Sequence, residues 1–141
     1  MAQGPWRRPP EMIDNHLVIT YPLAPPPTTH PMTLLYLNSD QMGSGDEELG
    51  RKLMNNFLAQ LAASATPIHL VGCVNSGVRL TTEGSKVIAH LEALKARGAR
   101  IATCATCLEH LGLEDKLLIG EVGTMEQSVQ AMAMADKVLR P

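Results

Sequence analysis

The chain has 141 residues, 45% of them hydrophobic and 18% charged, and a formal net charge of −2, a composition typical of one soluble globular domain. The small net charge and the presence of only one Trp, one Phe and two Tyr argue against a nucleic-acid partner, which needs basic surfaces and aromatic stacking. No apolar run reaches the roughly 18 residues that span a bilayer, and no secretory signal peptide is recognisable, so we expect no membrane partner.

Residues 1–31 differ in composition from the rest of the chain. They hold eight of the ten prolines, including a Pro-Pro-Pro run at 25–27. Because proline fixes φ and removes a backbone donor, we predict an extended or disordered tail with one isolated strand at 16–21. Met32 directly precedes the first convincing strand, so residues 1–31 are either such a tail or lie upstream of the natural start. We assign the folded domain to residues 32–141.

Short apolar runs alternate with helical patterns from Thr33 onward. The runs predict strands at 33–37, 68–74, 100–103, 116–119 and 137–139. Strands separated by helices imply right-handed crossovers and a parallel sheet covered on both faces. The pattern therefore predicts a three-layer α/β fold with about five strands.

Three helices are predicted between these strands. The first follows a Ser44–Glu47 capping box, the second ends at Gly98, and the third follows a Thr124–Gln127 capping box. Their predicted inward residues are Leu49, Leu53, Phe57 and Leu61 beside Met54 and Leu58 in the first, Val87, Ile88, Leu91 and Leu94 in the second, and Met125, Val129, Met132 and Ala133 in the third. The Met-rich and Ala-rich surface of the last helix also suits packing against another subunit.

Polar loops follow the first two strands, at 38–45 and 75–80, and the third strand leads into 103–107. In parallel α/β folds such loops meet beyond the carboxyl ends of the strands, where ligands bind. The candidate ligand-binding residues are Asn38, Gly43, Ser44, Gly45, Asn75, Ser76 and Gly77, with Arg79 as a nearby positive charge. Neither loop fits a nucleotide-binding motif. The alternative is that the glycines permit tight turns and Ser44 caps a helix.

Cys104 and Cys107 lie at the junction of a predicted strand and a short predicted helix. The positive end of a helix dipole favours a thiolate, so this placement is suited to a reactive sulfur offered to solvent. Cys73 lies within an apolar strand and is predicted to be a core residue. An odd count of three cysteines excludes a disulfide scaffold and favours the reducing cytoplasm.

Two other uses of a Cys-x-x-Cys pair are disfavoured. A thioredoxin-like protein needs a proline-bearing strand after the motif, and no proline lies between Pro67 and Pro141. A structural zinc site needs four ligands, and only His110 and Cys73 are available beside the pair. We therefore expect neither a metal nor another cofactor, and we predict that His110 lies at the surface, with proton donation as its alternative role.

Three stretches resemble the DsrE/DsrF-like family. They are residues 37–52 (LNSDQMGSGDEELGRK), 74–85 (VNSGVRLTTEGS) and 103–108 (TCATCL). The closest resemblance is to the C-terminal domain of YedF-type sulfurtransferase-like selenium-metabolism proteins, and it extends from about Thr33 to Leu139. It implies a flavodoxin-like fold, a homo-oligomer and sulfur carriage on a cysteine after the third strand.

The resemblance gives Cys104 the role of sulfur acceptor, with Gly112 closing the helical turn behind it. Cys107 matches the YedF-type Cys-x-x-Cys. The TusA-like domain that usually precedes it, with its Cys-Pro-x-Pro motif, is not found in residues 1–31, which contain no cysteine. The implied partners are therefore separate sulfur-donor and sulfur-acceptor proteins, with a TusA-like protein as one candidate.

Two hypotheses follow from the sequence. The first is a cytoplasmic, sulfurtransferase-like carrier of sulfur or selenium that holds a persulfide on Cys104 with help from Cys107. The second is a non-catalytic oligomeric binding module whose crevice holds an anion or small ligand and whose cysteines are structural. The exposure and reactivity of Cys104 separate the two.

Overall fold

The computed structural model describes residues 11–13, 16–18 and 31–141, and the chain divides between Pro31 and Met32 into two units. In the first unit, β1 (Glu11–Ile13) and β2 (His16–Val18) pair antiparallel, with Met12 opposite Leu17. The strand predicted at 16–21 is therefore confirmed over 16–18, and it is paired rather than isolated. The predicted extended or disordered tail otherwise lies outside the described residues.

The second unit contains a five-stranded, all-parallel sheet in the order β6-β5-β4-β3-β7. This arrangement confirms the predicted α/β class and is consistent with a flavodoxin-like fold. The strands are β3 (Thr33–Leu37), β4 (Leu70–Cys73), β5 (Arg100–Cys104), β6 (Glu121–Gly123) and β7 (Lys137–Leu139).

The strand predicted at 116–119 is wrong, because the fourth strand along this unit is β6. Leu117 makes only an isolated antiparallel bridge to Thr82, and Ile119 is buried. Gly120 then adopts φ +80° so close to the backbone of Ile101 that a Cβ there would lie 2.4 Å from its carbonyl oxygen. The apolar run therefore anchors the chain in the core before it turns into β6.

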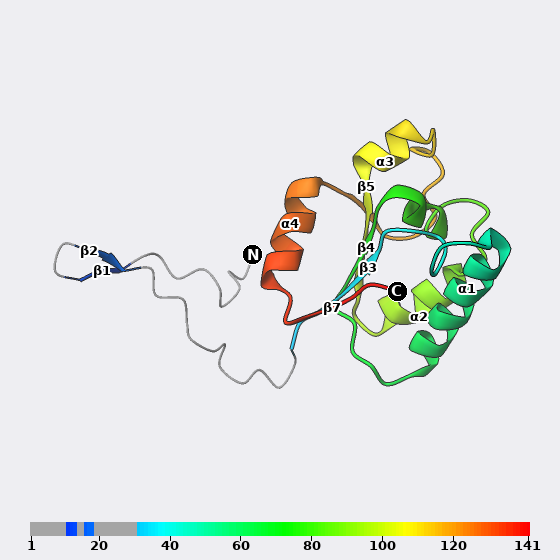
Figure 1. The fold of residues 1–141 in the computed structure, drawn as a ribbon. Coiled ribbons are helices and arrows are strands. Elements are labelled where there is room, and N and C mark those ends of the chain that lie inside the picture. Colours follow the sequence, from blue (N-terminus) through cyan, green and yellow to red (C-terminus); the bar gives the residue numbers. More distant parts are fainter. Residues whose placement is uncertain (1–10, 14–15, 19–30) are drawn as a thin grey trace. The chain divides into compact units, whose positions relative to one another are not determined.

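The helices cover the two faces of the sheet unequally. α1 (Glu47–Ala63) and α2 (Ile88–Ala96) lie on one side and α4 (Met125–Met134) on the other, while α3 (Ala105–His110) follows the carboxyl end of β5 (Figure 1). The loop predicted at 75–80 forms a 3₁₀ helix, η1 (Asn75–Leu80).

Two of the three predicted helix boundaries are confirmed. The Thr124–Gln127 capping box opens α4, and Gly98 follows the end of α2 with φ +103°. The predicted Ser44 cap is wrong, because Asp46 caps α1 by accepting a hydrogen bond of 2.8 Å from the backbone N–H of Leu49. A carboxylate directly before two glutamates of the first turn also complements the helix dipole.

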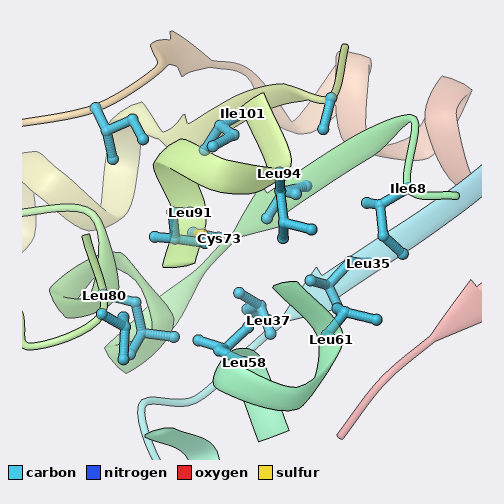
Figure 2. Close-up of a cluster of buried hydrophobic side chains, with 14 of the residues drawn as sticks. Leu35, Leu37, Leu58, Leu61, Ile68, Cys73, Leu80, Leu91, Leu94 and Ile101 are labelled. Atoms are coloured by element: carbon cyan, nitrogen blue, oxygen red, sulfur yellow. The ribbon is translucent and has the colours of Figure 1, made fainter. Parts of the chain in front are cut away.

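The principal core lies between the sheet and the α1–α2 pair. Leucines from β3, α1 and α2 form one cluster with Cys73, which lies at the end of β4 (Figure 2). The predicted inward stripe of α1 is partly wrong, because Leu49 is 53% exposed and Leu53 is also exposed. Gly50 packs instead, since it lies against the Gln41 side chain and lets the 38–45 loop approach the helix. The buried face of α1 consists of Gly50, Met54, Leu58 and Leu61.

The opposite face of the sheet carries α4, which has no buried residue. The prediction that its apolar residues point inward is wrong for this chain, because Met125, Val129, Met132 and Ala133 are exposed. The flanking strands β6 and β7 have only three residues each, so they offer the helix little surface on which to pack.

Candidate functional site

The loops after β3, β4 and β5 meet at the carboxyl edge of the sheet. The backbone N–H of Asp40 donates to Ser76 Oγ at 3.3 Å, and the Ser76 hydroxyl donates to Ser39 Oγ at 3.4 Å. On the other side, the N–H of Asn75 donates to Cys107 Sγ at 3.2 Å. These hydrogen bonds link three segments that are remote in sequence, so η1 lies between the first loop and the cysteine pair.

Gly77 has a structural role in this arrangement. A Cβ on Gly77 would lie 2.0 Å from the carbonyl oxygen of Leu37, so any larger residue would collide with the end of β3. Its N–H donates to Val74 O at 2.9 Å, and Asn75 adopts a positive φ of 51° at the start of the turn. The sequence Asn-Ser-Gly therefore forms the tight turn that brings η1 onto the strand ends.

The other candidate loop residues are less closely tied to the cysteines. Gly43 and Gly45 have φ values of +78° and +128° with open space around them, and Ser44 between them is exposed. Asn38 is half-buried directly after β3. Asp40, in the same loop, lies 3.6 Å from Arg51 of α1. This loop is therefore held against α1, and its described hydrogen bonds toward the cysteines end on Ser76 of η1.

Cys104 ends β5 and caps α3. Its Sγ accepts a hydrogen bond of 3.4 Å from the backbone N–H of Cys107. The side chain is only 8% exposed and packs with Val78 and Leu108. The expectation that Cys104 is offered freely to solvent is therefore wrong, because η1 and α3 both contribute an apolar residue beside it. Cys107 is half-buried and is the more accessible member of the pair.

The environment of Cys107 keeps its thiol protonated. Burial raises the pKa of Cys107, and its hydrogen bond to the Cys104 side chain raises the pKa further, while the N–H of Asn75 acts in the opposite direction. A negative charge on Cys104 also raises the pKa of Cys107. The predicted thiolate-favouring effect of the helix end is therefore outweighed at Cys107. α3 itself has only six residues, so specific N–H donors matter more here than its dipole.

Cys73, His69, His110 and Arg79 lie in environments that differ from that of the pair. Cys73 is 1% exposed in the core, as predicted, and burial raises the pKa of its thiol to about 12. His110 and Arg79 are exposed, and His69 accepts the N–H of Thr33 at 3.0 Å beside the opposite end of β3. Within the part of the chain that the structure describes, no three His, Cys, Asp or Glu residues are grouped as metal ligands.

Sequence reasoning missed a buried threonine pair next to the cysteines. Thr81 and Thr103 are fully buried, and their hydroxyl oxygens lie 2.8 Å apart. The Thr81 hydroxyl also lies within hydrogen-bonding distance of Val78 O, at 3.1 Å, and either hydroxyl can be the donor within the pair. This contact ties the end of η1 to β5 directly before Cys104. The only signal in the sequence is a hydroxyl residue at an inward position of an apolar strand.

Comparisons with known proteins identify the fold. The model of the DsrE/DsrF-like family matches residues 46–141. The crystal structure of the YchN protein from E. coli is 22% identical, with a TM-score of 0.56 over 79% of this chain and 100% of that chain. MTH1491 from Methanobacterium thermoautotrophicum, a protein of unknown function, is 19% identical, with a TM-score of 0.52 over the same shares of the two chains. No curated protein matches the chain. None of the helices described for residues 31–141 is long and apolar enough to cross a bilayer.

Proposed function

The chain belongs to the DsrE/DsrF-like family, which is associated with sulfur relay, and we propose that it carries sulfur as a persulfide on Cys104. The observation that carries the proposal is the backbone N–H of Cys107 donating to Cys104 Sγ at 3.4 Å. A donor aimed at the sulfur stabilises the negative charge that a thiolate or a persulfide anion bears. Cys104 also stands where the family resemblance places the sulfur acceptor.

The transfer step is a thiol exchange. The Cys104 thiolate attacks the terminal sulfur of a donor persulfide, a new S–S bond forms, and the bond between the two donor sulfurs breaks. The donor leaves as a thiolate, and Cys104 holds one additional sulfur. The reverse reaction with an acceptor thiolate delivers that sulfur, so no external oxidant or reductant is needed.

The low exposure of Cys104 bears on both hypotheses. Because Cys104 packs beside Val78 and Leu108, a persulfide there is less exposed to solvent than one on a surface cysteine. The same burial favours the alternative of a non-catalytic binding module with structural cysteines. Labelling of Cys104 in the native protein distinguishes the two, because a carrier needs a reachable sulfur.

The finer predictions from the sequence remain part of this proposal. They are the kinship with YedF-type proteins, selenium as an alternative cargo, a TusA-like partner, a cytoplasmic setting and a homo-oligomer. Residues 1–31 remain a predicted tail beside a sulfur-carrying domain at 32–141. The exposed apolar residues of α4 support the oligomer, because a second copy would remove them from water.

Intact-mass spectrometry after incubation with glutathione persulfide tests the proposal. We expect a mass gain of one sulfur atom in the wild-type protein and in Cys73→Ala, a matched control that removes the core cysteine. The gain should be absent in Cys104→Ser. If iodoacetamide labels Cys104 in a parallel native sample, but glutathione persulfide produces neither the adduct nor a disulfide, the binding module is favoured.

A further inference from the structure

Two hydrogen bonds place Cys107 beside Cys104. The backbone N–H of Cys107 donates to Cys104 Sγ at 3.4 Å. The N–H of Asn75 donates to Cys107 Sγ at 3.2 Å and holds this sulfur in place. The second thiol is therefore held one helical turn from the sulfur atom that would become the inner sulfur of a Cys104 persulfide.

We propose that Cys107 is a resolving cysteine, which attacks the inner sulfur of the Cys104 persulfide and releases the carried sulfur as hydrogen sulfide. This inference rests on the proposed persulfide at Cys104. It gives the site a second outcome besides transfer to an acceptor protein, namely reductive release of the cargo.

The step balances within the protein. A bond forms between Cys107 Sγ and Cys104 Sγ, and the bond between Cys104 Sγ and the carried sulfur breaks. Cys107 Sγ is oxidised to the disulfide level, Cys104 Sγ keeps the oxidation level that it has in the persulfide, the carried sulfur is reduced to sulfide, and the Cys107 proton leaves with it. A dithiol from solution must then reduce the disulfide before the next cycle.

Local geometry favours attack on the inner sulfur over a relay of the outer one. Cys104 has φ −59° and ψ 121°, so it lies outside the helix and its side chain turns back toward the first turn of α3. The hydrogen bond from the Cys107 N–H ends on the sulfur of Cys104 itself. Reactive Cys-x-x-Cys pairs close disulfides across this spacing.

Because the Cys107 thiol is mostly protonated, the resolving step is slow. Burial raises the pKa of Cys107, so only a small fraction of the molecules hold a Cys107 thiolate at neutral pH. A bound acceptor can therefore take the sulfur before Cys107 attacks. Release as sulfide becomes the outcome when no acceptor is present.

The experiment follows the lifetime of the adduct in the full chain. Wild-type protein, Cys107→Ser, Cys107→Ala and the control Cys73→Ala are loaded with glutathione persulfide and freed of small thiols by gel filtration. Intact mass then reports the adduct, and monobromobimane trapping reports sulfide. Circular dichroism checks that each variant is folded.

We expect wild-type protein and Cys73→Ala to lose the adduct with one equivalent of sulfide and to end two hydrogens lighter than the reduced chain. In both Cys107 variants the adduct should persist at least about tenfold longer, without sulfide. An adduct equally long-lived in wild-type protein and in Cys107→Ser would overturn the inference and leave the carrier function standing. Failure of every variant to take up sulfur at Cys104 would overturn both.

Discussion

The two faces of the parallel sheet are both apolar in sequence but differ in how they are covered. On the face toward α1 and α2, the inward residues of the three central strands are buried: Leu35, Leu37, Val71, Cys73, Ile101 and Thr103. On the face toward α4, Leu34 is buried, but Tyr36, Leu70, Gly72 and Ala102 are only half-buried. Two helices, α1 and α2, with 17 and 9 residues, cover the first face, while α4 with 10 residues lies alone on the second. An apolar pattern indicates which residues are to be buried, but it does not indicate whether a helix of the same chain or another subunit buries them.

The cysteines follow the same division. Cys73 pairs in register with Thr103, so both lie on the face toward α1 and α2. Cys104 comes one residue later, and because side chains alternate along a strand it points to the other face. There it meets Cys107 and a backbone N–H instead of a closed shell of leucines. A shift of one residue along β5, from the register position of Cys73 to Cys104, therefore separates a structural thiol from a candidate reactive thiol.

A pair of alanine substitutions tests this contrast most strongly. Leu58→Ala on α1 empties a fully buried position, and we expect the free energy of unfolding to fall by about 2–5 kcal/mol. Val129→Ala on α4 truncates a side chain that is 60% exposed, so we expect a change within about 0.5 kcal/mol. Urea denaturation of dilute protein measures both. Equal losses would mean that the α4 face is covered in solution.

A charge on the α4 face tests whether a second copy covers it. Met125, Val129 and Met132 are all exposed on this helix. If they meet a second subunit, Val129→Glu should weaken association by about tenfold or more, because a charge in an apolar interface is unfavourable. Sedimentation velocity over a range of concentrations measures this, with Leu49→Glu on exposed α1 surface as the control. A wild-type chain that is monomeric at every concentration would contradict the predicted homo-oligomer.

The sequence predicted the three central strands, which are buried on at least one face, and also β7 at the edge, which has no buried residue. The runs at 33–37 and 100–103 are recognisable because central parallel strands consist of continuous apolar residues. β6 was missed because its sequence, Glu-Val-Gly, has two exposed residues and a glycine. The run at 116–119 was misleading because burial of Ile119 produces an apolar pattern without a strand.

The site was predictable only where one short stretch carries the information. The Cys104–Cys107 spacing and the turn at Gly77 are local and were singled out. The Ser39–Ser76 and Thr81–Thr103 contacts join residues 37 and 22 positions apart, and hydroxyl residues of this kind are common in loops and strands. The burial of Cys104 depends on Val78, which η1 brings beside it, so no local pattern could predict it.

The pH dependence of the free energy of unfolding tests whether Cys73 is shielded from water in the folded chain. The pKa of this thiol is about 12 in the folded chain against 9.0 for the unperturbed group. Folding therefore favours the protonated form, so this stabilisation is complete below pH 9 and is lost as pH rises toward 12. Between pH 8 and pH 10, wild-type protein should lose about 1 kcal/mol more stability than Cys73→Val, as measured by urea denaturation. Parallel losses would show that water reaches Cys73 in the folded chain.

The smallest effect concerns the link between the buried face and Cys104. Thr103→Val removes the hydroxyl that bonds Thr81 at 2.8 Å, while Thr81 keeps its bond to Val78 O. We expect a loss of about 1 kcal/mol, because one hydrogen bond disappears and the chain keeps its shape. η1 is then held less firmly against β5, so Val78 should shield Cys104 less. Iodoacetamide should label Cys104 a few-fold faster, because a loss of about 1 kcal/mol raises the population of the open state by about that factor. Cys73 should remain unlabelled. An unchanged rate at Cys104 would mean that the two faces of the sheet are independent at this edge.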